Sequence, residues 1–334
     1  MNPTIKDVAK KAKVSTATVS RILNDLPGYS AKTKEKVLQA IEELGYQPNA
    51  VARGLIMKKT RTIGVLFPDV SNSFASEILN GIEDACNEMG HSVIVCNTAS
   101  NGIRTKKYLQ VLNEKRVDGI IYTSEMMKDE YHDIIQKMNV PVMLLSSVSY
   151  KHQLPYVRVD DRHAVYNGTE YLIKKGHEKI GMISGPKTDL IAGLPRVEGF
   201  QSALKENGLA HGEPLVEYAD GFGFKDGVVA LPKLLRKNKD LTAVVIASDE
   251  MAVGAISAAY RMGVKIPEQL SIIGYDNLPV SEMSIPPLTT IEQPLYEMGS
   301  KSAELLLKMI QTGEGVESVI MRHHIVERES VRAR

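Results

Sequence analysis

The chain has 334 residues, of which 43% are hydrophobic and 24% are charged, and its formal net charge at pH 7 is +1. This length predicts two or three domains, and the composition is typical of a soluble globular protein. The sequence contains no run of 18 apolar residues, which excludes an ordinary membrane-spanning helix. The first residues contain no apolar core of a secretory signal, and Cys86 and Cys96 alone make no disulfide framework. We therefore expect a cytoplasmic protein without membrane partners.

Charge is distributed unevenly along the chain. Residues 1–61 contain 12 Lys and Arg against 5 Asp and Glu, a net charge of +7. The remaining residues contain 29 against 35, a net charge of −6. A basic head on an acidic body indicates that only the head binds a polyanion such as DNA.

The stretch IKDVAKKAKVSTATVSRILN, residues 5–24, predicts two short helices separated by a turn at Lys13-Val14. Thr4 and Ser15 are suitable N-caps for these helices. Apolar residues recur at helical spacing on the inward side: Ile5, Val8, Ala9, Ala12, Val19, Ile22 and Leu23. The second helix directs polar or small side chains outward: Thr16, Ala17, Ser20 and Arg21. This pattern predicts a helix-turn-helix whose second helix is sized for the major groove.

A third helix is expected over Ala31–Leu44, where Gly45 ends it. Its predicted buried stripe completes a small helical core: Val37, Leu38, Ile41 and Leu44. Pro48-Asn49 then interrupts the chain, and Ala50–Met57 predicts a helix of only two turns, which is marginal in water by itself. A basic linker, residues 58–61, follows.

From Thr62 onward, short apolar strands alternate with amphipathic helices in two successive rounds. The predicted strands are TIGVLF, SVIVC, GIIY and VPVMLL, then KIGMIS, LVEY, TAVVIA and SIIGY. The predicted helices lie near 74–90, 104–115 and 128–138, then at 163–175, 196–207, 225–235 and 250–262. A last helix over 297–310 and a strand near 319–326 close the chain. Alternation of this kind predicts two Rossmann-like α/β lobes with parallel sheets covered on both faces.

Enzyme motifs are weak or absent in the sequence. Gly221 and Gly223 begin a glycine pattern, but the third glycine of G-x-G-x-x-G would fall on Asp226, so a tight strand-to-helix turn is favoured. No G-x-S-x-G elbow, P-loop or H-E-x-x-H occurs. The pair His323-His324 lies in a strand-like segment, where adjacent side chains point to opposite faces. We therefore expect no catalytic residue, no metal and no cofactor.

Two stretches of the head, TIKDVAKKAKVSTATVSRILN and LQAIEELGYQPNAVARGL, closely resemble the DNA-binding head of the lactose-repressor (LacI/GalR) family. The body resembles the same family in order and spacing through PDVSNSFASEILNGIEDAC, KKGHEKIGMISG, RVEGFQSAL, ASDEMAVGAI, IPEQLSIIGYDN and IPPLTTIEQP. The resemblance implies a body of the periplasmic-binding-protein type.

The resemblance also implies a division of the chain. A helix-turn-helix DNA-binding domain would occupy residues 1–48, a hinge helix and linker 49–61, and an effector-binding and dimerisation domain 62–334. Lobe one would comprise about 62–160 and 292–325, and lobe two about 161–291 and 326–334. The chain would cross between the lobes near Asp160, Ile291 and Val326.

For the head, the resemblance implies direct contacts with operator DNA. Arg21 can pair with guanine, whereas Thr16 and Ala17 offer only a hydroxyl or a methyl contact. Further DNA-contact candidates, which include phosphate or structural contacts, are Thr4, Ser15, Thr18, Ser20, Asn24, Tyr29 and Asn49. In the hinge helix, Leu55 matches a leucine that wedges into the minor groove, and Arg53 would flank that groove. The alternative is that Leu55 is a linker residue.

For the body, the resemblance implies an effector site at the carboxyl ends of the strands, between the lobes. The matching residues are Asp69, Asn72 and Phe74 from lobe one, Arg196, Ser248, Asp249 and Asp276 from lobe two, and Gln293 from a crossover. Their chemistry suits a sugar or a sugar derivative, because carboxylates and Arg hydrogen-bond hydroxyls and Phe stacks on a sugar ring. Asp249 could instead cap its helix, and Arg196 could instead bridge to a carboxylate.

These patterns predict a dimeric transcriptional repressor of carbohydrate-utilisation genes that binds a pseudo-palindromic operator and responds to a small sugar-like effector. One alternative is a global carbon-catabolite regulator of the same fold that is controlled by a phosphorylated carrier protein. Another is a free sugar-binding protein, which the basic head and the missing export signal argue against. The terminal VERESVRAR contains no leucine heptad, so a dimer is favoured over a tetramer.

Overall fold

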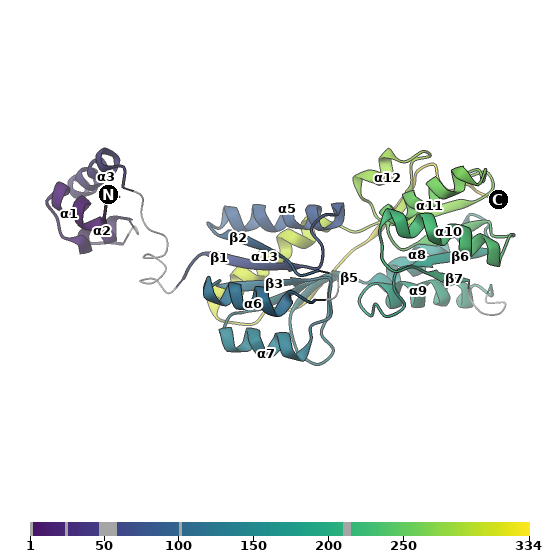
Figure 1. The fold of residues 1–334 in the computed structure, drawn as a ribbon, viewed down its shortest axis with the longest axis horizontal. Coiled ribbons are helices and arrows are strands. Elements are labelled where there is room, and N and C mark those ends of the chain that lie inside the picture. The colour runs from purple at the N-terminus through teal and green to yellow at the C-terminus, as the bar shows by residue number, and fades with distance from the viewer. Residues whose placement is uncertain (1–2, 24–25, 47–58, 100–101, 210–214) are drawn as a thin grey trace. The chain divides into compact units, whose positions relative to one another are not determined.

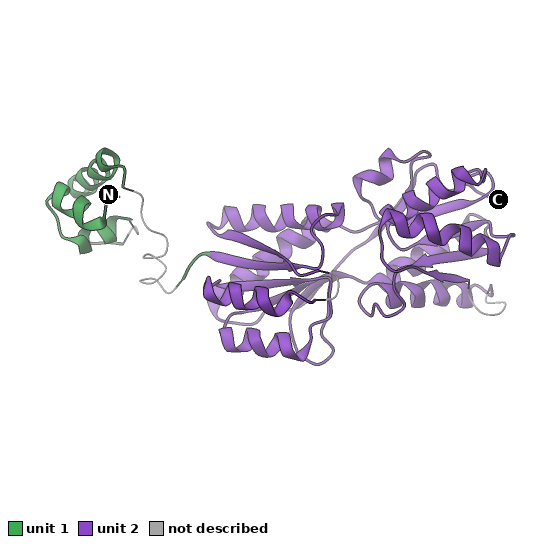
Figure 2. Ribbon diagram, in the orientation of Figure 1, with its two compact units in different colours: residues 1–61 green, residues 62–334 purple. Residues whose placement is uncertain are grey.

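The computed structural model describes residues 3–23, 26–46, 59–99, 102–209 and 215–334. The chain forms two compact units, residues 1–61 and 62–334 (Figure 2). The predicted hinge helix over 50–57 lies outside the described residues, as do the DNA-contact candidates Asn24, Asn49, Arg53 and Leu55.

The head contains the predicted helices α1 (Ile5–Ala12), α2 (Thr16–Leu23) and α3 (Ala31–Leu44). Lys13 takes the left-handed conformation, with φ of 55°, and this turns the chain between α1 and α2. Gly45 ends α3 with φ of 60°, a conformation that costs glycine little. The helix-turn-helix prediction is confirmed.

The head core is centred on Val8, Val19 and Val37, which are fully buried. The prediction that Leu38 belongs to this core is wrong, because 48% of its surface is exposed. The inward face of α3 carries Val37 and Ala40, and a residue one position away is rotated by roughly 100° around the helix.

Lobe one contains a parallel sheet with the strand order β11-β5-β4-β3-β1-β2. Its strands are β1 (Thr62–Phe67), β2 (Ser92–Asn97), β3 (Gly119–Thr123), β4 (Val142–Leu145), β5 (Tyr156–Val159) and β11 (Val319–Met321). Its helices are α5 (Ser73–Glu88), α6 (Thr105–Glu114), α7 (Asp129–Met138) and α13 (Leu295–Thr312). Helices α5 and α13 pack together on one face and α6 and α7 on the other (Figure 1). Because both faces are covered, β3 and β4 are buried along their whole lengths.

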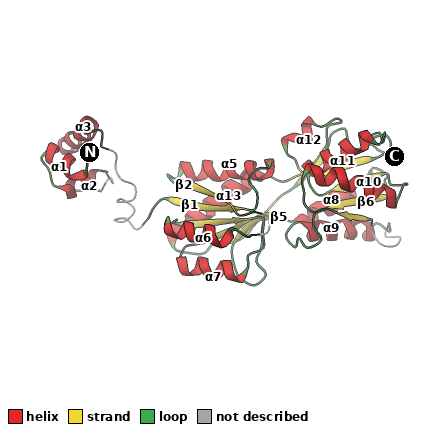
Figure 3. Ribbon diagram, in the orientation of Figure 1, coloured by secondary structure: helices red, strands yellow, loops and turns green. Residues whose placement is uncertain are grey.

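Lobe two repeats this architecture with the strand order β12-β10-β9-β8-β6-β7. Its strands are β6 (Ile180–Ser184), β7 (Val216–Tyr218), β8 (Ala243–Ile246), β9 (Ser271–Asp276), β10 (Thr289–Glu292) and β12 (His324–Val326). Its helices are α8 (Asp161–Lys174), α9 (Gly193–Glu206), α10 (Phe224–Lys237), α11 (Asp249–Arg261) and the short α12 (Pro279–Met283). Helices α8 and α9 pack as one pair and α10 and α11 as another, with the strands between them (Figure 3). Among the described strands of this lobe, β12 alone runs antiparallel, beside β10.

The chain passes between the lobes at Asp160, at residues 293–294 and at residues 322–323. The first position agrees with the prediction, whereas the second follows the predicted Ile291 and the third precedes the predicted Val326. The reason for the third difference is that the expected strand over 319–326 is two strands in different sheets, β11 and β12. Strands β5 and β10 and helix α12, each only four or five residues long, were not predicted. None of the described helices is long and apolar enough to cross a bilayer.

Candidate functional site

The outward face of α2 presents short polar side chains and one cation. Thr16, Ala17 and Arg21 are exposed, and Ser20 is half-buried. The guanidinium of Arg21 donates one long hydrogen bond of 3.4 Å to the carbonyl oxygen of Pro27. These positions lie on one side of the helix, since their spacing is close to one turn. Such a face can approach the edges of bases and present a charge-assisted donor to them.

Other DNA-contact candidates hold the helix ends in place. The backbone N–H and the hydroxyl of Thr4 both donate to Asp7, at 2.8 and 2.7 Å, and this lowers the pKa of the Asp7 carboxyl. Ser15 caps α2 by accepting from the N–H of Thr18 at 3.1 Å, and the two hydroxyl oxygens are 3.0 Å apart. Tyr29 packs half-buried against the head core. Thr4 and Ser15 thus start the two helices whose geometry the recognition face needs.

In lobe two, a buried ion pair lies beside the carboxyl ends of the strands. Arg196, on α9, donates through Nε to Asp161 at 2.8 Å and through Nη1 to the carbonyl oxygen of Ala247 at 2.5 Å. Its guanidinium stacks 3.9 Å from the ring centre of Tyr275, whose hydroxyl donates to the same Asp161 oxygen at 2.9 Å. Burial opposes the charge of Arg196, but the Asp161 carboxylate raises the Arg196 pKa above its usual range. The predicted alternative of a bridge from Arg196 to a carboxylate is therefore present.

Asp276, the last residue of β9, and Gln293 are brought into direct contact. The Gln293 amide donates to Asp276 at 2.7 Å, and only 4% of Asp276 and 5% of Gln293 are exposed. Burial raises the pKa of Asp276 to about 7, against the opposing effects of Arg196 and the Gln293 hydrogen bond. The backbone of Asp276 has a φ of 112°, a conformation that residues with side chains rarely adopt. This carboxyl can therefore accept hydroxyl hydrogen bonds, and it changes charge near neutral pH.

Ser248 and Asp249 begin α11 and have different structural partners. Ser248 is the N-cap, accepting from the N–H of Met251 at 3.2 Å and donating to the carbonyl oxygen of Phe222 at 2.5 Å. Asp249 is fully buried and accepts from the N–H of Leu278 at 2.7 Å and from the Thr290 hydroxyl at 2.6 Å. Both oxygens of Asp249 are thus engaged within lobe two, and burial raises its pKa well above the ordinary value.

The lobe-one candidates gather where β1 leads into α5. Asp69 accepts from the N–H and the hydroxyl of Ser71, and Asn72 caps α5 by accepting from the N–H of Ala75 at 2.8 Å. Phe74 is half-buried against the core. A long hydrogen bond of 3.5 Å, from the N–H of Ser73 to Glu250, the second residue of α11, joins this region to lobe two.

Four residues of this region were not predicted from the sequence as members of the site: Asp161, Phe222, Glu250 and Tyr275. Phe222 lies with its ring centre 5.8 Å from the Arg196 guanidinium, on a loop before α10. The signal for Asp161 was its position directly after the first crossing, where a strand of lobe one ends. Tyr275 gave no signal, because it stands within an apolar strand. The glycine turn predicted before α10 is present, with the N–H of Gly223 donating to Asp226 at 3.0 Å.

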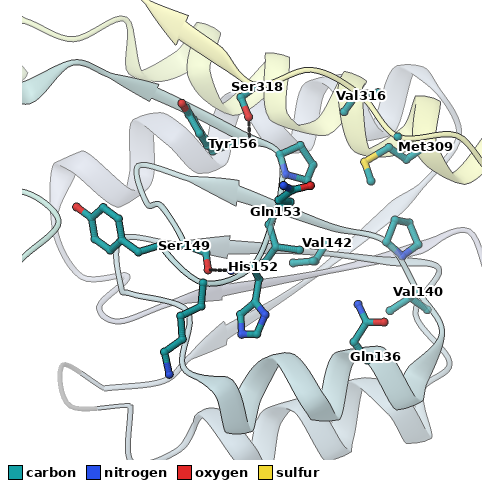
Figure 4. Close-up of a pocket in the computed structure, with 16 residues that line it drawn as sticks. Gln136, Val140, Val142, Ser149, His152, Gln153, Tyr156, Met309, Val316 and Ser318 are labelled. Carbon is teal, nitrogen blue, oxygen red and sulfur yellow. Dashed lines mark hydrogen bonds between the residues drawn. The ribbon is translucent and has the colours of Figure 1, made fainter.

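A pocket of about 760 Å³ lies elsewhere, at the amino ends of β4, β5 and β11 in lobe one. Its lining includes Val142, Tyr156 and Ser318, and also His152 on the β4–β5 connection (Figure 4). It contains none of the predicted effector residues, and strand ends of this kind are not where open α/β sheets bind ligands. Among the described residues, no group of three or more His, Cys, Asp or Glu is arranged to hold a metal.

Family models match both units of the chain. The model described as "Bacterial regulatory proteins, lacI family" matches residues 4–49, and that of "Periplasmic binding proteins and sugar binding domain of LacI family" matches residues 60–329. The chain belongs to the LacI family of bacterial regulatory proteins. The family and the fold class predicted from the sequence are both confirmed.

Individual members of the LacI family match over the full length. Catabolite control protein A of Priestia megaterium is 39% identical, with 98% of each chain covered. The lac repressor dimer bound to operator and the anti-inducer ONPF has a TM-score of 0.89 at 30% identity, with both chains fully covered. The transcriptional regulator CelR in complex with cellobiose has a TM-score of 0.75 at 32% identity, with 98% of this chain and 99% of that chain covered. Relatives of this chain are thus transcriptional regulators.

Proposed function

We propose that this LacI-family member is a transcriptional repressor that binds a pseudo-palindromic operator as a homodimer and is controlled by a small sugar or sugar derivative. The observation that carries this proposal is the exposed face of α2 on a basic head, joined in one chain to two α/β lobes. The full-length likeness to the operator-bound lac repressor supports DNA as the partner, and the likeness to CelR with cellobiose supports a carbohydrate effector. Two identical heads on a two-fold dimer require matching half-sites.

On the head, we assign base contacts to Arg21, with weaker contributions from Thr16, Ala17 and Ser20. Thr18 and Tyr29 are assigned to phosphate or structural contacts, together with Thr4 and Ser15, whose side chains already hold helix ends. The candidates Asn24, Asn49 and Arg53 extend this surface by sequence alone. Phosphate contacts fix the register of the head, and Arg21 supplies discrimination between bases.

In the hinge, Leu55 is proposed to wedge into the minor groove at the operator centre. Leu55→Ala should then remove most of the operator bend and weaken specific binding several-fold, while binding to random DNA changes little because the basic head remains. Circular-permutation gel mobility of wild type and variant on one selected operator measures the bend. Equal bending by both proteins would establish Leu55 as a plain linker residue.

In the body, Asp276 and Gln293 are proposed to contact the effector beside Arg196, with Asp69, Asn72 and Phe74 contributing from lobe one. Ser248 and Asp249 belong to the same predicted set, but we assign them to shaping the site, because their polar atoms have structural partners. Asp276→Ala should weaken effector binding by roughly 1.5–3 kcal/mol, the cost of losing a hydrogen bond to a charged group. Calorimetry with the identified effector tests this assignment.

The likeness to catabolite control protein A keeps open a second form of control, in which a phosphorylated carrier protein replaces or assists the small molecule. Calorimetric titration with a sugar panel, repeated with the phosphorylated carrier, distinguishes the two. The proposal places the protein in the cytoplasm, where operator DNA is found, and includes no catalysed reaction and no cofactor. The proposed domain division is a DNA-binding head of residues 1–48, a hinge and linker of 49–61, and an effector-binding body of 62–334.

A further inference from the structure

Residues 26–28, which precede α3, turn back onto Arg21 of the recognition face. The N–H of Leu26 donates to the backbone carbonyl oxygen of Arg21 at 2.9 Å. The carbonyl oxygen of the next residue, Pro27, accepts from Nη1 of the Arg21 guanidinium at 3.4 Å. Two consecutive loop residues therefore contact both the backbone and the side chain of Arg21.

Gly28 leaves open the space in which the Arg21 guanidinium lies. Its φ is 114°, a backbone conformation that glycine adopts at little cost and other residues rarely adopt. A Cβ atom on Gly28 would lie 2.6 Å from Nη1 of Arg21 and 3.8 Å from its Cζ. Non-bonded heavy atoms pack at about 3.5–4.0 Å, so the first of these contacts is too close. Any side chain at position 28 would therefore displace the guanidinium.

The backbone around Gly28 is attached to the head on both sides. Before it, Leu26 is hydrogen-bonded to α2. After it, Tyr29 is half-buried against the head core, and Ser30 caps α3 by accepting from the N–H of Thr33 at 3.2 Å. The guanidinium, in contrast, is the far end of a flexible side chain. When the space at Gly28 is filled, we therefore expect the guanidinium to move and the loop to stay.

The contact with the loop affects how Arg21 can read a base. A guanidinium has two edges with parallel N–H groups, one formed by Nη1 and Nη2 and the other by Nε and Nη2. Because Nη1 of Arg21 is directed to Pro27, the edge of Nε and Nη2 is the one that can pair with O6 and N7 of guanine. A long side chain loses rotamer freedom when it is fixed on DNA, and a side chain already held by the protein loses less.

We propose that Gly28 is a positioning residue for base recognition by Arg21. It keeps open the space that the guanidinium occupies, and the Pro27 carbonyl oxygen directs Nη1 so that the edge of Nε and Nη2 faces guanine. This inference rests on the proposed function, in which α2 reads the operator through Arg21.

The test measures discrimination between bases by the full-length protein on an operator selected by the wild type. The base pair that Arg21 reads is found by comparing wild type with Arg21→Ala on single-base-pair variants of that operator. At this pair, wild type should discriminate by roughly 5- to 150-fold, the range for one bidentate contact. Gly28→Ala should remove most of this discrimination, while affinity for random DNA should change by less than about twofold because the phosphate contacts remain.

A double-mutant cycle separates positioning of Arg21 from a general effect on the head. In the Arg21→Ala background, Gly28→Ala should change operator affinity by less than about twofold, because the side chain that it displaces is absent. An equal loss of affinity in both backgrounds would show that Gly28 acts through the folding of the head and would overturn the proposal. Unchanged discrimination in Gly28→Ala, with Arg21 still reading its base pair, would also overturn it and leave the proposed function in place.

Gly45→Ala is the matched control in the same head. Gly45 also has a positive φ, of 60°, but no atom lies within 4 Å of the position of its Cβ. This variant adds backbone strain without displacing Arg21, so its discrimination should equal that of wild type. A loss equal to that of Gly28→Ala would contradict the positioning role. If Arg21→Ala keeps the wild-type discrimination at every base pair, the assignment of Arg21 in the proposed function is wrong, and the role of Gly28 fails with it.

Discussion

The recognition face of α2 and the buried site around Arg196 in lobe two each contain an arginine, but the two arginines have opposite surroundings. Arg21 stands exposed with one long hydrogen bond, whereas Arg196 is buried and tied to Asp161, Ala247 and Tyr275. An exposed cation keeps its full capacity for a polyanion but is screened by salt. A buried, paired cation is insensitive to salt and fixed in direction. Exposure therefore suits the head to DNA, whereas pairing fixes the Arg196 guanidinium in the body in one direction.

The largest effect should appear when salt is raised during operator binding. Because residues 1–61, the head with its hinge and linker, carry a net charge of +7 and bind through exposed cations, operator affinity should fall by about 10³–10⁵-fold between 50 and 200 mM salt, the range for six to ten phosphate contacts. Effector affinity should change little over the same interval, since the charged groups of the proposed effector site in the body are buried and paired. A slope of log K against log salt near zero for operator binding would contradict the proposal that operator binding, unlike effector binding, depends on exposed cations.

The next effect should follow removal of the partner of Arg196. Asp161→Ala leaves the guanidinium buried without its carboxylate and also leaves the Tyr275 hydroxyl unpaired, so the body should lose about 3–5 kcal/mol of unfolding free energy. The control is Asp240→Ala, which breaks a pair with Lys179 whose side chains are 72% and 57% exposed. That variant should lose no more than about 1 kcal/mol. Urea unfolding measures both, and equal losses would show that burial does not distinguish these pairs.

A smaller effect should depend on pH. The pKa of Asp276 is raised from 3.8 to about 7, so the folded state binds a proton that the unfolded state has released between these values. The contribution of Asp276 to stability is then present at low pH and is lost as pH rises through about 7. Asp276→Asn should therefore raise Tm by several degrees at pH 8 and by clearly less at pH 5. Scanning calorimetry at the two pH values measures the difference, and an equal gain at both would contradict the raised pKa.

The sequence predicted the head and its exposed face well, because caps, turns and apolar spacing are local. Leu38 was misplaced because single apolar residues beside a stripe do not reveal their direction. In the body, the alternation of strands and helices predicted the lobes, but β11 and β12 were read as one strand because they are adjacent in sequence and separate in space.

Most residues of the candidate site were predicted from the sequence, but the hydrogen bonds between them were not. Asp276 and Gln293 were both named from the family resemblance, yet their mutual hydrogen bond joins residues 17 positions apart. Asp161 was missed because its partner Arg196 lies 35 positions away on another helix. Contacts of this kind depend on how α8 packs on α9, which no local pattern records.

The central claim is that DNA recognition belongs to the head and effector recognition to the body. The direct test uses residues 62–334 as a fragment beside the full-length protein, with DNA selected by the full-length protein and the effector found in the calorimetric panel. The account predicts that the fragment binds effector with the affinity of the full-length protein and causes no mobility shift of the selected DNA. A fragment that shifts this DNA specifically would contradict it.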